Sequence, residues 1–509
     1  MHSLSLSLFD QGPSTPCPAP FNLAAYVLAR TDTQPDKPAL GILGQNNARF
    51  WTYRALKSAV LGTATGLLAQ GLVRGDIVLL RLGNTVDFPL AYLGAIAAGL
   101  VPVPTSSQLS EVEVAHIITT LKPALILQSA GVACPQNCGV PVIGEAALED
   151  MQSLPPAAFD MGDPDRLAYI IYTSGTSGTA RAVGHAHRAI WARRMMYKGW
   201  YDLREDDRML HAGAFNWTYT LGTGLMDPWS MGATALIPQA GTELGEIPKL
   251  LKRHHATIFA AAPGVYRKIL SGDFPDLPEL RHGLAAGEKL SAQIRQDWNA
   301  KTGRKVYEAF GMSECSTFIS GSPAHPARSG ALGQPQIGRR VAIVDETGPV
   351  AIGREGTIAI DRCDPGLMIG YIGAPAETAA KMQGDWFLTG DRAKMAADGQ
   401  ITYLGRRDDM MNAGGYRVSP LEVEAAMLAH PDIDEIGVTD MEVKPDVRII
   451  IALYTSQTAI PEGRLLEFAA KNLARYKCPR AFLRVEALPR GANSKLLRRA
   501  MVPIYEARL

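Results

Sequence analysis

The chain has 509 residues, which is too many for a single hydrophobic core, so we expect at least two domains. Its 47% hydrophobic and 20% charged residues are typical of a folded globular protein and exclude an intrinsically disordered chain. The formal net charge of +1 gives no overall attraction to polyanions, so nucleic acid is not an expected partner.

The N-terminal segment and the six cysteines bear on the cell compartment. Residues 1–10 lack the basic start and apolar core of a signal peptide. The most apolar segment, 89–104, is interrupted by Gly and Pro and is too short to span a bilayer. The cysteines do not form two closely spaced pairs, which disfavours a zinc site and favours reduced thiols. We therefore expect a cytoplasmic protein without a membrane span.

Short apolar runs separated by helix-like segments predict α/β layers with largely parallel sheets. The predicted strands lie at 76–82, 123–128, 167–172, 233–238, 256–262 and 305–310. Helical patterns lie between some of these runs, at 187–200 and 290–301. The wholly apolar run at 167–172 has the length of a strand that is buried on both faces.

The pattern changes after about residue 355 to hairpin-rich β structure, followed by a compact α+β unit. That unit contains predicted helices at 421–430 and 462–475, and strands at 433–440, 447–454 and 481–488. We predict a large multilayer α/β domain at 1–404, a charged hinge at 405–409 and a small, mobile α+β domain at 410–509.

The strand at 167–172 leads into a loop that suits phosphate groups. Residues 173–178 read TSGTSG, and a cation follows at Arg181. Hydroxyls and close-approaching backbone N–H groups bind phosphate oxygens. Neither glycine is followed by Lys, so this is not the P-loop pattern, and no G-x-G-x-x-G opens a helix. The loop predicts a nucleotide triphosphate site; an ordinary polar surface loop is the alternative.

Further motifs follow in a fixed order along the chain. They are 286–290 (AGEKL), 307–314 (YEAFGMSE), 389–391 (TGD), 405–409 (GRRDD), 414–424 (GGYRVSPLEVE) and 489–495 (PRGANSK). With the loop at 173–178, they resemble the AMP-forming adenylating superfamily of acyl-CoA synthetases, peptide-synthetase adenylation domains and luciferases. The resemblance covers about residues 20–500, is nearest to medium-chain and aryl acid–CoA ligases, and implies the hinged two-domain fold of that superfamily.

The resemblance implies a nucleotide site that is spread over these motifs. Triphosphate contacts would come from the hydroxyl-rich loop and the cation after it, namely Thr173, Ser174, Gly175, Thr176, Ser177, Gly178 and Arg181. Nucleotide contacts would come from two later segments, namely Gly287, Glu288, Lys289, Glu308, Ala309, Phe310, Gly311, Met312 and Ser313. Asp391 and Arg406 would contact the ribose side.

Several of these side chains have a specific expected role. Phe310 would stack on adenine, with a plain core aromatic as the alternative, and Ser313 would bond a phosphate oxygen. Glu314 and Thr176 would hold Mg²⁺, a hard cation that prefers oxygen ligands. Asp391 would accept hydrogen bonds from both ribose hydroxyls.

Lys495 is the predicted catalytic cation, with Glu314 as the second catalytic residue. A carboxylate that attacks an α-phosphate brings two anions together, and a cation that reaches both offsets their repulsion. The resemblance implies that Lys495 lies on a mobile loop of the small domain. A solvated basic tail is the alternative, since Arg498 and Arg499 follow.

The resemblance also implies a second step in which CoA receives the acyl group. The small domain would turn about Asp408, remove Lys495 from the site and present the loop Gly414, Gly415 and Tyr416 to the pantetheine arm. Two glycines let a thiol arm pass close to the backbone, although a simple turn explains them almost as well.

The chain departs from the family pattern directly after the phosphate loop. Residues 178–182 read GTARA, where family members read close to G-K-P-K-G. Arg181 keeps the positive charge but as a planar fork, and Ala182 replaces a glycine. Asn412 and Ser494 also stand where family members usually have Lys and Gly.

The acyl pocket is expected around residues 211–224, with Trp217, Tyr219 and Gly222 as its candidates. The position where peptide synthetases carry an Asp for the α-amino group falls near Tyr219, which disfavours an amino acid substrate. Aromatic walls fit an aryl acid and a short- or medium-chain acid equally well. A Trp in a core needs no ligand, so a structural role for Trp217 stays open.

We therefore predict an ATP-dependent acid–CoA ligase that uses ATP, Mg²⁺ and coenzyme A. It would convert a small carboxylic acid to acyl-AMP with release of pyrophosphate, and then transfer the acyl group to CoA. One alternative is a stand-alone adenylase that loads a carrier-protein thiol. Another is a non-catalytic nucleotide or acyl sensor, and a homodimer also stays open.

Overall fold

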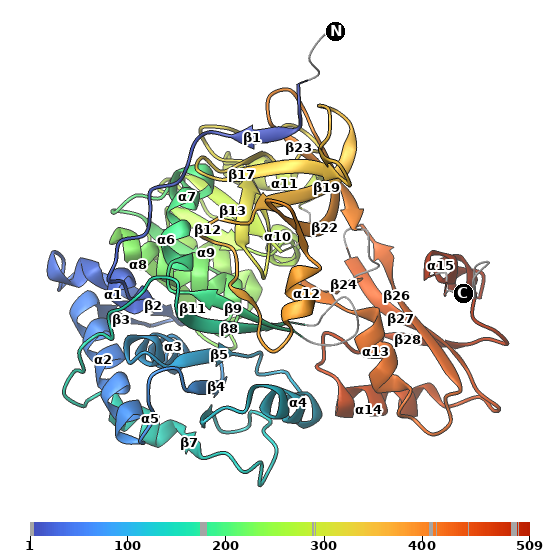
Figure 1. Cartoon of the computed structure of the whole chain (residues 1–509), viewed down its shortest axis with the longest axis horizontal. Helices are drawn as coiled ribbons and strands as arrows, with labels where there is room; N and C mark the ends of the chain where they lie inside the picture. The colour runs from blue at the N-terminus through green and yellow to red at the C-terminus, as the bar shows by residue number, and fades with distance from the viewer. Residues whose placement is uncertain are drawn as a thin grey trace.

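The computed structural model describes residues 5–173, 181–287, 290, 292–406, 411–413, 415–445, 447–489, 496 and 498–508. Counted over these residues, the chain forms sheets of nine, seven, four and three strands before residue 407, and sheets of three and two strands after it. Figure 1 shows the later elements, β24 to α15, grouped at one side of the larger body. Helices α4 and α14 make contact between the two parts.

The nine-stranded sheet contains the strands predicted at 233–238, 256–262 and 305–310. Its order is β16 (Gln334–Pro335), β15 (Ser316–Ser320), β14 (Val306–Met312), β13 (His282–Ala286), β12 (Ile258–Ala261), β10 (Arg208–His211), β11 (Thr234–Pro238), β2 (Pro38–Leu43) and β3 (Ala48–Thr52). The six strands from β14 to β2 in this order pair in parallel. Both β12 and β13 are buried along their whole length, which explains their largely apolar sequence.

Helices alternate with these strands, as the sequence predicts. They are α1 (Leu23–Val27), α6 (Ala189–Ala192), α7 (Arg194–Met196), α8 (Asp227–Met231), α9 (Ile247–Arg253), α10 (Pro263–Leu270) and α11 (Ala292–Thr302). Two π-helical segments, η2 (Tyr197–Tyr201) and η3 (Thr220–Met226), interrupt this series. The helix predicted at 187–200 is therefore broken into α6, α7 and η2.

A four-stranded parallel sheet lies beside this layer, in the order β5 (Val101–Pro104), β4 (Ile77–Arg81), β6 (Leu125–Gln128) and β7 (Val142–Gly144). Its helices are α2 (Tyr53–Ala69), α3 (Asp87–Ala97), α4 (Glu111–Leu121) and α5 (Glu145–Met151). Every residue of α3 is buried, so the apolar segment at 89–104 includes part of a core helix. Among the described residues, no helix is long and apolar enough to cross a membrane.

The expectation for residues 167–172 is wrong in one respect. The run is a strand, β8 (Leu167–Thr173), but only two of its seven residues are buried. It pairs antiparallel with β9 (Arg181–Ala186), which pairs with β20 (Gly370–Tyr371). Burial alternates because one face of this small sheet borders a cavity. The pairing also sets Thr173 opposite Arg181, on either side of the predicted phosphate loop.

The hairpin-rich region is the seven-stranded antiparallel sheet, as predicted. It consists of β1 (Leu8–Asp10), β17 (Arg340–Asp345), β18 (Gly348–Pro349), β19 (Glu355–Asp361), β21 (Met382–Gln383), β22 (Trp386–Met395) and β23 (Ile401–Arg406). The short helix α12 (Pro375–Ala379) leads toward β21.

The C-terminal α+β unit has its own core. Its elements are β24 (Met411–Ala413), β25 (Tyr416–Val418), α13 (Pro420–Met427), β26 (Glu435–Lys444), β27 (Val447–Thr455), α14 (Glu462–Asn472), β28 (Ala481–Arg484) and α15 (Arg498–Glu506). Val423, Met427 and Leu465 are fully buried there. The predicted fold class, a multilayer α/β part followed by a small α+β part, is confirmed. The boundaries at 404, 405–409 and 410 stay predictions.

A buried ion pair supports the hairpin formed by β14 and β15. Arg339 donates to Asp364, and their side chains are 0% and 1% exposed. Arg339 Nη2 also donates to the Thr317 carbonyl of β15 at 3.4 Å, and Asp364 accepts from the Gly366 N–H at 2.7 Å. Removing one partner of a buried pair leaves an uncompensated charge, which costs about 3–5 kcal/mol.

We predict that Arg339→Met lowers the thermal unfolding midpoint by several degrees, because Asp364 would remain buried without its cation. The control is Arg54→Met, since the Arg54–Asp36 pair is 64% and 80% exposed and contributes about 0–1 kcal/mol. Equal midpoints for the two variants in differential scanning calorimetry would contradict the prediction.

Candidate functional site

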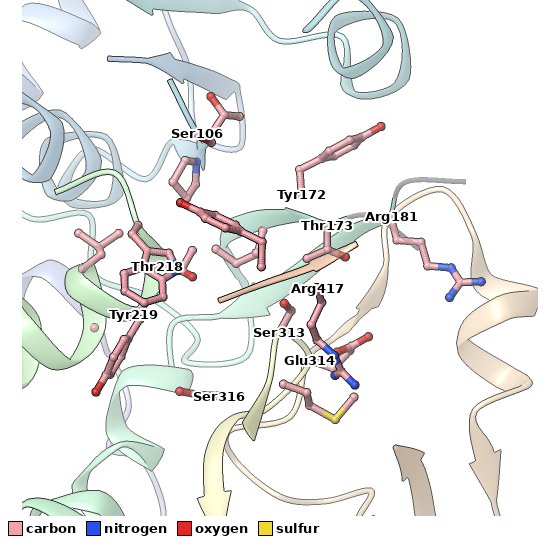
Figure 2. Close-up of a pocket in the computed structure, with 18 of the residues that line it drawn as sticks. Ser106, Tyr172, Thr173, Arg181, Thr218, Tyr219, Ser313, Glu314, Ser316 and Arg417 are labelled. Carbon is pink, nitrogen blue, oxygen red and sulfur yellow. The ribbon is translucent and has the colours of Figure 1, made fainter. Parts of the chain in front are cut away.

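A cavity of about 570 Å³ brings together residues from distant parts of the sequence. Twelve of the predicted site residues line it: Thr173, Arg181, Trp217, Tyr219, Gly222, Gly287, Gly311, Met312, Ser313, Glu314, Gly415 and Tyr416. In Figure 2, Arg181 lies toward one side and Tyr219 toward the other, with Ser313, Glu314 and Arg417 between them. One cavity therefore joins the predicted phosphate, acyl and CoA segments.

The turn between β14 and β15 contributes hydroxyl and carboxylate groups to the cavity wall. Ser316 has a φ of +59°, in the left-handed region, and a Cβ on Gly311 would lie 2.2 Å from the Ser316 carbonyl oxygen. The turn therefore requires glycine at 311. Glu314 accepts a hydrogen bond from the Tyr371 hydroxyl at 2.7 Å. Burial and the Glu314 charge raise the pKa of Tyr371, which keeps its hydroxyl protonated as the donor.

Arg181 lines the cavity but is held by a carboxylate. Its Nε donates to Glu377 of α12, and its guanidinium carbon lies 5.1 Å from the centre of the Tyr371 ring. These contacts fix the orientation of the planar guanidinium group. Sequence reasoning found Arg181 from its position after the loop, but missed Glu377 and Tyr371.

Four predicted residues lie behind the cavity wall. Glu308 is buried, pairs with Arg295 and accepts from the Leu290 N–H at 3.1 Å. Ala309 is also buried, and the Phe310 ring packs against Phe318 and Tyr403, with ring centres 5.6 Å apart in both cases.

Asp391, the fourth of these residues, is fully buried and receives hydrogen bonds from both parts of the chain. It accepts from the Tyr403 hydroxyl at 3.1 Å and from Arg417 at 3.3 Å. Arg417 follows β24 and the predicted hinge, so this contact joins the small domain to the large one.

The predicted acyl residues belong to η3 and the segment before it. Trp217 and Tyr219 pack edge to face with ring centres 5.1 Å apart, and Trp217 also lies 6.5 Å from Tyr416. A Cβ on Gly222 would lie 2.6 Å from Arg193 Nη2, so the missing side chain makes room for a guanidinium. Arg193 also lines the cavity, and sequence reasoning missed it.

Two residues of the predicted CoA loop, Gly415 and Tyr416, line the cavity. The Gly415 carbonyl oxygen lies 3.7 Å from where a Cβ on Gly287 would be, and Gly415 has a φ of +87°. The Tyr416 ring stacks on Tyr476 with ring centres 4.0 Å apart. Residues of the small domain therefore form part of the cavity wall.

An ion triad holds the small domain against α4. Lys477 Nζ lies 2.8 Å from Glu113 of α4 and 2.6 Å from Glu422 of α13. Burial lowers the pKa of Lys477, but Tyr476 and the two carboxylates together outweigh burial, and the net pKa is raised. Ser110 Oγ donates to the Asn472 carbonyl at 3.2 Å beside it. The sequence gives no signal for this triad, because its members lie on three separate helices or loops.

Other predicted residues lie outside the described part of the chain. They are Ser174, Gly175, Thr176, Ser177, Gly178, Glu288, Lys289, Asp408, Gly414 and Lys495. The backbone of Arg406 is described in β23, but its side chain is not. The roles of all these residues stay predictions.

Two family models match the chain. The model of the AMP-binding enzyme matches residues 28–372, and that of the AMP-binding enzyme C-terminal domain matches residues 422–495. The chain belongs to the AMP-binding enzyme family. The family predicted from the motifs is confirmed.

This AMP-binding enzyme is similar to named relatives along most of its length. Acyl-coenzyme A synthetase ACSM3, mitochondrial, of Rattus norvegicus is 28% identical, and the match covers 94% of this chain and 90% of the relative. The 3-hydroxybenzoate–CoA ligase of Aromatoleum sp. (strain CIB) is 28% identical over 91% of this chain and 92% of the relative. These names agree with the predicted class of enzyme.

Solved structures agree with the predicted two-domain fold. A benzoate CoA ligase from Burkholderia xenovorans LB400 has a TM-score of 0.70 at 25% identity, over 94% of this chain and 99% of that chain. The o-succinylbenzoate CoA synthetase of Bacillus subtilis has a TM-score of 0.82 at 23% identity, over 93% of this chain and 97% of that chain. The latter likeness shows the fold.

We predict that Lys477→Met loosens the small domain from α4, because Glu113 and Glu422 would then face each other without a cation. The contact should weaken by about 3 kcal/mol. Small-angle X-ray scattering should show a larger radius of gyration. Lys471→Met is the control, since Lys471 is exposed on α14. Indistinguishable scattering from the two variants would show that the triad does not hold the domain.

Proposed function

We propose that this AMP-binding enzyme is an ATP-dependent acid–CoA ligase. It activates a carboxylic acid to acyl-AMP with release of pyrophosphate, and then forms acyl-CoA and AMP. The observation that carries the proposal is that one cavity is lined by Arg193 and Met226, by Glu314, and by Tyr416 and Lys477 of the small domain. Such a cavity can bind an acid at its inner end while a thiol arm enters beside the small domain.

The residues around Glu314 fit a magnesium ion. No cluster of three or more His, Cys, Asp or Glu side chains that could hold a metal occurs in the described residues. Mg²⁺ needs no such cluster, because it binds through one or two carboxylates together with phosphate oxygens and water. Glu314 supplies the carboxylate, and Ser313 and Thr173 add hydroxyls to the same cavity. Mg²⁺ would neutralise phosphate charge there.

Two orientations of the small domain account for the two steps. From Cys478 onward, no described residue lines the cavity, whereas Gly415, Tyr416 and Tyr476 do. This orientation suits entry of the thiol arm. We assign Lys495 to the first step alone, with the small domain turning about the hinge between the two steps.

CoA is preferred over a carrier-protein thiol as the acceptor, because the relatives' names describe CoA synthetases and CoA ligases. Retention of Glu314, Asp391 and Lys495 disfavours a sensor without activity. We also keep as predictions the ribose contact of Asp391, the adenine contact of Phe310, the cytoplasmic location and the homodimer.

ATP–pyrophosphate exchange across a panel of aryl and short- to medium-chain acids tests the proposal. Turnover with CoA should exceed turnover with a holo carrier protein. Folded protein that catalyses no exchange with any acid would contradict the ligase function, and preference for the carrier would favour the adenylase.

We predict that Lys495→Ala lowers exchange by roughly 10²–10³-fold, because a cation that stabilises the transition state is lost. Conversion of supplied acyl-AMP and CoA to acyl-CoA should stay within about twofold of wild type. Lys471→Ala serves as the control for loss of a positive charge. If both half-reactions fall equally, Lys495 does not act in the first step alone.

A further inference from the structure

The inner end of the cavity contains a buried ion pair that the predicted reaction does not use. Arg193, between α6 and α7, donates from Nε and Nη2 to the Asp227 carboxylate at 2.8 and 2.6 Å. Asp227 is 0% exposed, whereas the Arg193 side chain is 12% exposed. Arg193 lines the cavity and Asp227 does not. The cavity wall therefore presents a guanidinium with its counter-charge behind it.

Further polar groups surround Arg193. Its Nη1 donates to Ser316 Oγ, and its Nη2 lies 3.4 Å from Thr223 Oγ1. The Tyr201 hydroxyl donates to Asp227 at 2.7 Å and helps to hold the carboxylate. Ser316 and Thr223 both line the cavity. Figure 2 shows Ser316 and Tyr219 on the side of the cavity that lies away from Arg181. The predicted acyl region thus ends in hydrogen-bonding groups.

A second polar group in the same cavity is independent of this pair. His185 of β9 is buried, and burial lowers its pKa to about 4, so the ring is neutral near pH 7. Its Nε2 lies 2.7 Å from the Ser313 carbonyl, which assigns the ring proton to Nε2. Nδ1 is then an acceptor, and no described residue bonds it. An unsubstituted acyl group would displace water from the polar groups that line this wall and offer them no hydrogen bond in return.

We propose that the acid activated by this enzyme carries a neutral hydrogen-bonding substituent, a hydroxyl or keto group, which Arg193 and Ser316 bind at the inner end of the cavity. The inference rests on the proposed ligase function and narrows its substrate class. An oxygen of either group accepts hydrogen bonds from the Arg193 guanidinium. A purely apolar acid fits this end less well than a substituted acid of the same length.

The charge balance disfavours a second carboxylate as this substituent. Arg193 is already neutralised by Asp227, at two donor–acceptor distances below 3 Å. A substrate carboxylate at the same point would leave one uncompensated negative charge in a buried network, which is far more costly than a neutral dipole. The ion pair therefore binds and orients a dipole rather than an anion.

Gly222 is part of this arrangement. A Cβ at this position would lie 2.6 Å from Nη2 and 2.8 Å from Cζ of Arg193. Any side chain would displace the guanidinium from the cavity wall. Gly222 is thus a positioning residue for Arg193, and it offers a test that leaves both charges in the chain.

The test compares matched acids that differ only in the remote substituent. One series is benzoate, 3-hydroxybenzoate and isophthalate, and the other is hexanoate, 6-hydroxyhexanoate and adipate. Two quantities are measured, kcat/KM for ATP–pyrophosphate exchange and Kd of the free acid by calorimetry. Wild-type protein should favour the hydroxy acid over both analogues by roughly ten- to a hundredfold in at least one series.

Two variants assign the preference to the ion pair. Arg193→Met with Asp227→Leu replaces the buried pair by apolar side chains, a change that often preserves folding, and the ratio of hydroxy to unsubstituted acid should fall to about one. Gly222→Ala should reduce the same ratio without a change of charge. Arg194→Met is the control, because Arg194 is the exposed neighbour of Arg193, and it should keep the wild-type ratio. Circular dichroism checks that each variant folds.

The outcomes separate this inference from the ligase function. Preference for the unsubstituted acid or the dicarboxylate in both series would overturn the inference, even with active enzyme. An unchanged ratio in both folded variants would also overturn it. If no acid supports exchange but the hydroxy acid still binds more tightly in an Arg193-dependent way, the ligase function fails and the site assignment stands.

Discussion

The turn between β14 and β15 is the constraint on which the rest of the site depends. It is tight enough that a Cβ at Gly311 would meet the Ser316 backbone, and Ser316 takes a left-handed conformation. Three residues of this turn accept hydrogen bonds from other elements. The Ser313 carbonyl accepts from His185, the Glu314 carboxylate from the Tyr371 hydroxyl, and Ser316 Oγ from Arg193. The buried Arg339–Asp364 pair stabilises the same turn. A shift of the turn would therefore displace Glu314, the proposed metal ligand, together with Ser316 in the proposed acyl region.

Contact between the two parts of the chain combines charge with a stacked aromatic pair. Lys477 neutralises two carboxylates from opposite sides, and Tyr416 stacks on Tyr476 where the small domain meets the cavity. Arg417 extends the same contact to Asp391. Charged groups regain their hydration when such a contact opens, which suits the proposed turn of the small domain between two steps. A wholly apolar contact would resist that turn.

Patterns that are local in the sequence predicted the fold and the centre of the site well. Strands such as β11 and β12 are short, largely apolar runs. The turn at 311–316 is indicated by a glycine beside hydroxyl and carboxylate residues. The partners of those residues could not be predicted in this way. Glu377 reaches Arg181 across 196 positions, and Glu113 reaches Lys477 across 364.

Such pairings depend on which elements the topology brings together, and periodicity does not encode that. The Arg193–Asp227 pair was missed for a related reason. Both residues look like ordinary helix positions in the sequence. Their role depends on tertiary packing, which buries Asp227 behind Arg193 at the cavity wall. Antiparallel pairing of β8 with β9 was missed as well, because an apolar run does not show which strand it pairs with or in which direction.

Every described arginine that lines the cavity is paired with a carboxylate, which limits the positive charge that it can offer to a reaction. Arg181, Arg193 and Arg417 each face a carboxylate, namely Glu377, Asp227 and Asp391. Paired guanidiniums orient ligands through fixed donors, but they add little net positive charge. Attack of a carboxylate on a phosphate needs net positive charge at the reacting atoms. In the proposed reaction, that charge comes from Mg²⁺ and from Lys495, which the turning domain can bring and remove. In the proposed reaction, the fixed wall therefore sets orientation and selectivity, and the turn of the small domain sets when the chemistry occurs.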